Sequence, residues 1–525
     1  MYYFIPAWYN DDNNRPWYHA TRLWFRLFER MTFDDTVNQI KMFHRADEDV
    51  QLLVLNYQPH FRYFLHKQGL LGTSYWSFFD DIQHISDSVS RPISFKELNW
   101  PEGTQFLYSP FAVVARRDGI DFATIHFAEN GNLFYIEFMK EGQRDKQYLF
   151  DDRGFLSSIL YYDESGKESH QDYLNANGVW QVREYLHPDA KWKIEVNAVA
   201  DLSFNNRFYK NWVNLILERL LLLKKREIAT TDKMVIACHE QHNSLLLNVF
   251  EEQQKVLSFF GDRFSYPKTV ATKELLVDSD ILVVDTQKQE IRLVDFLDEL
   301  NISLKKLSRI SPFDTRLRLG HSQMMRELIV YFYIDTISDS DLKLALKTIL
   351  EVMNVNEDIN LSLITFDQGR SLKELETWLS QRIKKKYDVE KFFGVSNDGE
   401  NQLEEDETLE LSRIYLNCFT NENEIIQALD TARLVVDLGN EPDLYTQIAS
   451  ISAGVPQINS VVSDYVSHKK NGWVITEEAS LEKALHYYLD GLRNWNASLV
   501  YSTQKMADYT SGRILEQWKV LLERE

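Results

Sequence analysis

The sequence predicts an α/β protein with two Rossmann-like domains and an antiparallel β-meander inserted into the first of them. Near both ends of the chain, short apolar runs alternate with segments of helical hydrophobic spacing, which is typical of α/β layers. Between them, glycines recur every eleven or twelve residues behind polar turns, which indicates short strands joined by tight turns. A chain of 525 residues is also too long for a single core. We therefore expect one domain from residues 1–95 and 199–312, an inserted domain at 96–198, and a third at 313–525.

The first Rossmann-like domain opens with aromatic-rich elements. Trp8 and Trp17 flank the polar loop Asn10–Asn14, which follows the first predicted strand. Ligands of doubly wound sheets bind beside the carboxyl ends of the strands, so these two tryptophans are candidate ligand or partner contacts. The predicted elements are the strands Tyr3–Ile5 and Gln51–Leu55, a helix at Ala20–Glu29 and a helix from Phe61.

The inserted segment repeats a polar turn that ends in glycine. Strand-like segments such as Leu133–Phe138 and Ser157–Tyr162 lie between these turns, so the pattern is that of a β-meander. A flat sheet with one solvated face could dock another protein, and a purely structural insert fits the pattern equally well. The recurring glycines are Gly119, Gly131, Gly142, Gly154, Gly166 and Gly178.

After the meander the chain returns to α/β texture and completes the first domain. His242 follows a predicted strand, where it could face an acceptor or be an ordinary loop histidine. A metal site is not expected, because His239 and His242 have no third ligand nearby in the sequence. The predicted elements are the helix Val213–Arg226, the strand Met234–Cys238, a helix from Ser244, a helix at Gln254–Phe260 and the strand Ile281–Val284.

The second Rossmann-like domain contains the most informative stretch of the sequence. A buried strand closes at Gly439, a helix follows, and Gly454 supplies its left-handed cap two residues before Pro456. The predicted strands are Leu328–Ile334, Leu361–Phe366 and Leu434–Leu438; the predicted helices are Leu342–Met353, Tyr445–Ser452, Leu481–Leu492 and a last helix, Ser498–Leu522, that folds back to the first domain.

This order of strand, acidic turn, helix, Ala-Gly-Val-Pro and strand resembles the nucleotide-sugar site of retaining GT-B glycosyltransferases. The resemblance implies a GT-B-like fold and a helix with two donor-site glutamates separated by seven residues. Glu441 matches the first glutamate, whereas the second position is Ala449, which has no carboxylate. The frame of a sugar-nucleotide site is thus present without one of its two principal groups.

The groups expected around the donor diphosphate are also changed. In that family a strand of the second domain is followed by an arginine and then a lysine, whereas here Asp335, Asp339 and Asp341 come first and Lys343 is the first cation. Cations are needed because negative charge builds up on the leaving diphosphate. We therefore expect no catalytic residues, no cofactor and no enzyme activity.

Two alternatives to a non-catalytic protein remain. An active glycosyltransferase with a rearranged donor site would need Glu441 and a cation such as Lys469 or Lys470. A glycan-binding module would instead depend on Trp8 or Trp17.

Charge and cysteine content exclude several classes of function. The net charge is −21, from 58 basic and 79 acidic residues, so nonspecific nucleic-acid binding is not expected. Cys238 and Cys418 cannot build a disulfide framework or a thiolate metal site. The first residues lack the pattern of a signal peptide, and no apolar stretch reaches about 18 residues. We expect a cytoplasmic protein, or a peripheral one on the inner face of the cell membrane.

The whole chain also resembles a known protein family. The opening MYYFIPAWY, the junction PFDTRLRLGHSQ, the meander and the altered donor motif are together similar to the first accessory secretory proteins (Asp family) of streptococcal and staphylococcal accessory Sec systems. The resemblance implies a non-catalytic export factor that acts with the second and third Asp proteins. It also implies the accessory motor ATPase, the translocon and a glycosylated serine-rich-repeat adhesin as partners. In the junction, Arg316 and Arg318 could fix the domains, or face a partner or an anionic membrane surface.

Overall fold

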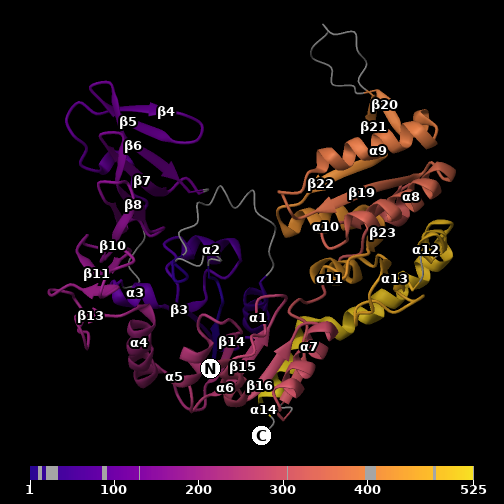
Figure 1. The fold of residues 1–525 in the computed structure, drawn as a ribbon. Coiled ribbons are helices and arrows are strands. Elements are labelled where there is room, and N and C mark those ends of the chain that lie inside the picture. The colour runs from indigo at the N-terminus through magenta and orange to yellow at the C-terminus, as the bar shows by residue number, and fades with distance from the viewer. Residues whose placement is uncertain are drawn as a thin grey trace. The chain divides into compact units, whose positions relative to one another are not determined.

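The computed structural model describes residues 1–9, 15–18, 34–85, 91–128, 130–303, 306–395, 409–476 and 480–523. The chain forms two compact units (Figure 1): the first has residues 1–25, 39–284 and 292–308, and the second has 26–38, 285–291 and 309–525. The predicted helix Ala20–Glu29 and the loop Asn10–Asn14 lie outside the described residues.

A parallel sheet forms the centre of the first unit. Within the described residues its seven strands lie in the order β17-β16-β15-β14-β1-β2-β3, the order of a doubly wound sheet. β1 pairs with β2 on one side and with β14 on the other, so the chain leaves for the meander and returns beside its own first strand. The strands are β1 (Tyr2–Ile5), β2 (Val50–Val54), β3 (Ser74–Ser77), β14 (Lys233–Ala237), β15 (Gln254–Phe259), β16 (Ile281–Val284) and β17 (Lys306–Arg309).

One predicted element of this sheet is wrong. The helix expected at Gln254–Phe260 is the strand β15, which pairs in parallel with β14 and β16. It is buried from Lys255 to Phe259. A strand covered on both faces has no alternation of polar and apolar residues, so its sequence can be mistaken for a buried helix.

Short helices connect these strands. α4 begins behind Asn211, whose side chain accepts a hydrogen bond from the Asn214 backbone, and it ends in three basic residues that suit the negative end of a helix. The helices are α2 (Phe61–Lys67), α3 (Phe78–Ile82), α4 (Trp212–Glu227), α5 (Asn243–Val249) and α6 (Val270–Asp278), with α1 (Asp35–His44) and α7 (Gln287–Glu299) containing residues of both units.

The segment after α3 forms an antiparallel sheet in which ten described strands, β4 to β13, lie in chain order. Glycine is needed at Gly154, where φ is +91° and a Cβ would lie 1.7 Å from the Arg91 carbonyl oxygen. The strands are β4 (Gln105–Tyr108), β5 (Val113–Arg117), β6 (Ile120–Phe127), β7 (Leu133–Lys140), β8 (Gln143–Phe150), β9 (Leu156–Tyr162), β10 (Glu168–Leu174), β11 (Trp180–Tyr185), β12 (Ile194–Val196) and β13 (Phe208–Tyr209).

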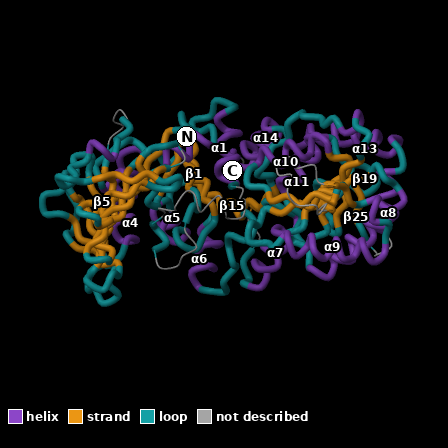
Figure 2. The backbone as a smooth tube through the Cα atoms, turned by 90° about the horizontal axis from the view of Figure 1, so that it is seen from above, coloured by secondary structure: helices purple, strands orange, loops and turns teal. Residues whose placement is uncertain are grey.

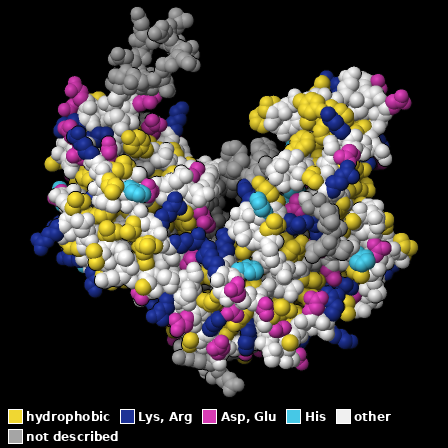
Figure 3. Space-filling model, turned by 180° about the vertical axis from the view of Figure 1, so that it is seen from behind, with side chains coloured by type: hydrophobic (Ala, Val, Ile, Leu, Met, Phe, Trp, Pro, Cys, Tyr) yellow, Lys and Arg dark blue, Asp and Glu magenta, His cyan; other side chains and the backbone are white. Residues whose placement is uncertain are grey.

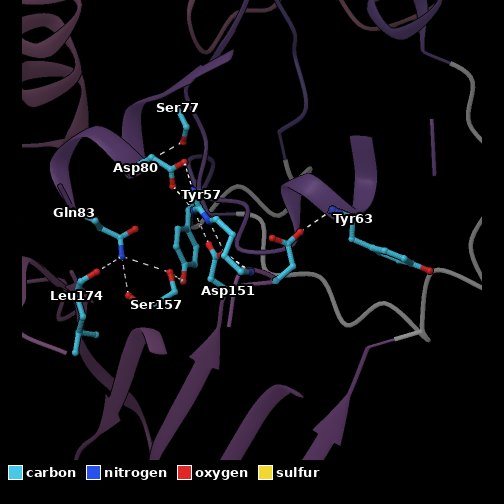
Figure 4. A network of polar contacts seen from close by, with 10 residues as sticks. Tyr57, Tyr63, Ser77, Asp80, Gln83, Asp151, Ser157 and Leu174 are labelled. Carbon is cyan, nitrogen blue, oxygen red and sulfur yellow. Dashed lines mark hydrogen bonds and ion pairs between the residues drawn. The ribbon is translucent and has the colours of Figure 1, made fainter. Parts of the chain in front are cut away.

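Buried polar contacts fix this sheet to the parallel sheet of the same unit (Figure 4). Arg153, in the turn between β8 and β9, donates hydrogen bonds of 2.7–2.9 Å to Asp151 and to Asp80 of α3. Tyr57 donates to Ser157, and Gln83 donates to the backbone carbonyl of Ser157. Because these groups are buried and paired, the meander is a firmly attached part of the first unit.

The second unit repeats the doubly wound order. Six of its described strands lie in the order β22-β19-β18-β23-β24-β25, and every adjacent pair is parallel. Helices cover both faces of this sheet (Figure 2), with α8 against α12 and α11 against α10 and α13. The strands are β18 (Leu328–Tyr333), β19 (Ile359–Thr365), β22 (Ile414–Cys418), β23 (Ala432–Asp437), β24 (Gln457–Asn459) and β25 (Gly472–Val474), with a small ribbon of β20 (Phe393–Val395) and β21 (Leu409–Leu411).

The last helix of the prediction is divided in two. α13 ends at Met506, a short 3₁₀ turn follows, and Thr510 is extended with ψ 151° before α14 begins. The helices of this unit are α8 (Asp339–Val355), α9 (Leu372–Lys386), α10 (Glu422–Thr431), α11 (Leu444–Ala453), α12 (Ser480–Leu489), α13 (Leu492–Met506) and α14 (Ser511–Glu523). Across the described residues, no helix combines the length and apolar character that a membrane crossing requires.

Candidate functional site

The predicted donor-site residues gather at one place in the second unit. The strand order reverses between β18 and β23, and doubly wound sheets bind ligands beside the carboxyl ends of strands at such a point. β18 ends at Tyr333, β23 ends at Asp437, and Gly439 and Glu441 follow β23 directly. The motif predicted from the sequence therefore lies at the position where this fold would hold a ligand.

Asp437 organises the acidic turn from inside the protein. Its side chain is 1% exposed and accepts hydrogen bonds from the backbone of Gly439 (3.2 Å) and of Asp443 (2.8 Å). Burial raises the pKa of Asp437 to about 8, so the group is mostly protonated at neutral pH. Asp443 in turn caps α11 by accepting from the Thr446 backbone at 2.7 Å. Sequence reasoning missed Asp437, although an aspartate inside the apolar run Leu434–Leu438 was the available signal.

The two glycines of the motif are held by close packing. At Gly439 a Cβ would lie 1.7 Å from the Thr336 hydroxyl oxygen, so the ends of β18 and β23 touch. Gly454 caps α11 with φ +72°, which confirms the predicted left-handed conformation. A Cβ at Gly454 would lie 2.2 Å from Leu499. Both positions are therefore required by the fold, whatever they bind.

The two positions of the glutamate pair have different surroundings. The side chain of Glu441 is 48% exposed and forms an ion pair with Lys288, which the contacts assign to the same unit. Ala449, on α11, is partly buried and packs against an apolar cluster that includes Tyr331 and Tyr333. The methyl group at position 449 faces a core, and it offers no hydrogen bond to a sugar.

The aspartates after β18 are bound within the protein. Asp335 accepts hydrogen bonds from the Thr365 hydroxyl and, at 2.8 Å, from the Phe366 backbone. Asp341 accepts from Ser338 at 2.6 Å at the start of α8. These contacts give the aspartates structural roles at the strand ends and the helix start.

Arg370 is the cation that sequence reasoning missed. It lies in the loop after β19, and it donates to the backbone carbonyl of Ile334 at 2.6 Å and to Asp339 at 3.4 Å. Its side chain is 20% exposed. A positive charge thus stands beside the end of β18, supplied by a neighbouring strand rather than by the segment that follows β18.

The two lysines considered for a rearranged donor site rest on aromatic rings. The Lys469 ammonium lies 5.0 Å from the centre of the Trp473 ring, and the Lys470 ammonium lies 5.1 Å from that of Tyr501. Cation–π contacts of this kind hold a side chain against the surface of its own unit.

The first unit has a second reversal of strand order, between β1 and β14. His242 lies there and is fully buried, with Nδ1 2.7 Å from the Tyr9 hydroxyl and Nε2 2.8 Å from the Ala237 carbonyl oxygen. Burial lowers the pKa of His242 to about 3, so the imidazole is neutral. Both ring nitrogens are used inside the protein, which leaves His242 without a hydrogen bond for an acceptor.

The two candidate tryptophans lie in different environments. Trp17 is 4% exposed and belongs to the hydrophobic core of the first unit, so its expected role as an exposed ligand contact is wrong. It packs edge-on against Tyr9 at 5.3 Å. Trp8 is partly buried, and its ring meets Phe64 edge-on at 5.0 Å. The aromatic content of this segment predicted the core rather than the exceptions to it.

Arg316 and Arg318 lie on an exposed segment of the second unit. The backbone of Arg316 donates to the Ser452 hydroxyl at 3.1 Å, and that of Arg318 donates to the Ser452 carbonyl at 3.2 Å. Their side chains are exposed, with the Arg316 guanidinium 3.6 Å from Asp314. The segment is held by its backbone, and its two charges remain at the surface.

Comparison with known proteins identifies the family. The model of the family of first Asp proteins of the accessory Sec system matches residues 1–524. The chain belongs to this family. The member from Streptococcus gordonii is 36% identical over 528 residues, which cover 100% of this chain and 99% of the relative. The family resemblance predicted from the sequence is confirmed.

Two solved complexes contain chains similar to this one over their whole length. One is a structure of accessory secretory proteins 1, 2 and 3 in Streptococcus pneumoniae, with 32% identity, a TM-score of 0.80 and coverage of 100% of this chain and 99% of the other. The other is the Glycosylation Associate Protein (Gap123) complex from Streptococcus agalactiae, with 37% identity, a TM-score of 0.79 and coverage of 98% and 99%. Members of the family are thus found in complexes of three kinds of chain.

The fold is that of GT-B glycosyltransferases. The pneumococcal O-GlcNAc transferase GtfA, solved with UDP and GlcNAc, matches 99% of this chain and 98% of its own with a TM-score of 0.70 at 11% identity. The GT-B-like fold class predicted from the sequence is therefore confirmed, and at this identity the likeness extends to the fold alone.

Proposed function

We propose that this protein is a non-catalytic scaffold of an accessory Sec export complex, built on a glycosyltransferase frame. In this proposal it assembles with the second and third accessory secretory proteins and delivers a glycosylated serine-rich-repeat adhesin to the accessory motor ATPase and translocon. Membership of the family and the likeness to chains in two three-protein complexes support the assembly. The proposed domain boundaries remain those at residues 96–198 and 313.

The observation that carries the non-catalytic interpretation is the use of the donor-side groups by the protein itself. Glu441 pairs with Lys288, and Arg370 binds the Ile334 carbonyl and Asp339. Position 449 has only a methyl group, which packs on the core. A glycosyltransferase needs these groups directed at the nucleotide and its diphosphate, because charge builds up on the leaving group. Their internal pairing favours a frame that no longer turns over a sugar nucleotide.

The location of the protein follows from the same proposal. We place it in the cytoplasm, in contact with the inner face of the membrane through its complex. Arg316 and Arg318 present two exposed charges on one backbone-anchored segment, which suits contact with a partner or an anionic membrane surface.

The proposal is tested by calorimetry of UDP-glucose and UDP-N-acetylglucosamine against the purified full chain, with Glu441→Ala as the matched variant. We expect no heat of binding at millimolar donor for either protein. Saturable binding that Glu441→Ala abolishes would show a functional donor site and would return the chain to the glycosyltransferases. Binding of free glycan without nucleotide, lost in Trp8→Ala, would instead favour a glycan-binding module.

A further inference from the structure

The ten-stranded sheet ends in an edge strand, β4, whose outer side is open. Within the described residues no strand pairs with that side, because β4 is the last strand in the order. Its inner side pairs with β5, in register from Gln105 with Arg116 to Tyr108 with Val113. An open edge of this kind presents a row of backbone donors and acceptors to any extended chain.

The hairpin geometry shows which backbone groups face outward. The Ser109 backbone donates to the Ala112 carbonyl at 3.0 Å, so these two residues form a hydrogen-bonded pair at the turn. Hydrogen-bonded and non-hydrogen-bonded pairs alternate along an antiparallel ladder. Leu107 therefore bonds to β5, whereas the N–H and C=O groups of Phe106 and Tyr108 point away from the sheet.

The strand at this edge and the turn behind it are apolar and uncharged. Tyr108 is 64% exposed and Phe111 is 84% exposed, and Leu107 is exposed as well. Figure 3 shows hydrophobic side chains gathered at this end of the sheet. Residues 103–115 contain no charged side chain, and the nearby Lys96 ammonium, 5.8 Å from the Tyr108 ring, belongs to another segment. Lysines and inward-pointing charges on the strand are the usual protection of an exposed edge, and β4 has neither.

The edge is also rigid enough to act as a template. Phe95 packs edge-on against Phe106 at 5.0 Å, and Trp100 packs against Phe106 at 5.4 Å. Both rings adjoin a local hydrophobic cluster that includes Val113 and Ile125. A partner strand would thus meet a preformed edge and would not have to order it.

We propose that the outer edge of β4 binds an extended, uncharged and apolar segment of one of the two partner chains of the accessory secretory complex, which adds to the sheet as an eleventh strand. This rests on the proposed function. A second copy of this chain is a poor occupant, because two molecules of net charge −21 repel one another. The segment hydrogen-bonds to Phe106 and Tyr108, and its apolar side chains cover Leu107, Tyr108 and Phe111.

The test uses the full chain and the second and third accessory secretory proteins from the same bacterium, purified separately and titrated against it. Tyr108→Pro removes an outward N–H without touching the bonds to β5, and proline is tolerated on edge strands. Tyr108→Thr is the matched variant, since it removes the ring and keeps the N–H. We expect Tyr108→Pro to weaken binding of one partner about tenfold or more, and Tyr108→Thr to weaken it less. Leu107→Lys, which places a charge on the edge, should weaken the same partner.

Each other outcome overturns the inference in a distinct way. Equal binding by the wild type, Tyr108→Pro and Leu107→Lys, with unchanged thermal unfolding, would remove β4 from the interface. Binding of neither partner by the wild-type chain would overturn the proposed function, and this inference with it. A wild-type dimer in sedimentation that Tyr108→Pro converts to monomer would assign the edge to a second copy.

Discussion

Gly439 and Thr336 join the carboxyl ends of two neighbouring strands, with the Thr336 hydroxyl oxygen 1.7 Å from where a Cβ of residue 439 would stand. Thr336 follows β18 and Gly439 follows β23, at the point where the strand order of the second unit reverses. In a sheet of this kind the ends of these two strands border the ligand position. Here they touch each other.

Gly439→Ala should therefore destabilise the second unit by about 1–3 kcal/mol, because the new methyl group must displace Thr336 or the backbone. Gly512→Ala is the matched control, since a Cβ at that position in α14 meets no atom within 4 Å. Urea unfolding followed by tryptophan fluorescence measures both. Equal stability of the two variants would mean that the strand ends separate easily.

Arg153 gives a second prediction, for the attachment of the meander. Its side chain is 5% exposed and paired with Asp151 and Asp80, so Arg153→Met leaves two carboxylates without their cation. We expect a loss of about 3–5 kcal/mol in the first unit. Arg116→Met, which breaks an exposed ion pair with Asp121 in the same sheet, should cost much less. Similar losses in urea unfolding would contradict a role for burial.

His242 predicts how stability falls in acid. Its pKa is lowered from 6.5 to about 3 in the folded protein by burial, so the unfolded chain takes up a proton first as the pH falls. The stability from neutral His242 is complete above pH 6.5 and is lost below it, with a slope that approaches about 1.4 kcal/mol per pH unit. Unfolding of wild type and His242→Gln from about pH 7.5 to about 4.5 should show a shallower decline in the variant. His486→Gln, at an exposed histidine, should decline as the wild type does.

Much of the fold could be predicted because its signals are local. The glycine turns of the meander follow one another within a dozen residues, and the stretch from Leu434 to Pro456 contains its own strand, turn, helix and cap. Such signals need no knowledge of distant segments. The error at β15 arose where the local signal was ambiguous, in a strand buried on both faces.

The site was less predictable because its groups come from distant parts of the chain. Arg370 reaches the Ile334 carbonyl across 36 residues, and Tyr9 reaches His242 across 233. Sequence spacing along one strand indicated an acidic, cation-poor site, whereas the neighbouring strand supplies a cation. The predicted exposure of Trp17 failed for a similar reason, since its core neighbours come from other elements.

Asp437 gives the last prediction, at neutral to alkaline pH. Burial raises its pKa from 3.8 to about 8, so the folded protein keeps a proton that the unfolded chain has already lost. The resulting stability is complete below pH 3.8 and is lost as the pH rises through 8. Asp437→Asn keeps the shape but cannot ionise, so the stability difference between wild type and variant should shift toward the variant from about pH 5 to about 9.

The amide of the variant has only one acceptor oxygen for the two backbone N–H groups of Gly439 and Asp443, so the wild type should be the more stable protein in acid. Asp118→Asn, in an exposed turn, is the control for removing one carboxyl group from a chain of net charge −21. Unfolding in urea at matched ionic strength measures all three proteins. A difference that does not change with pH would mean that Asp437 is already ionised in the folded protein, with Gly439 and Asp443 compensating its burial.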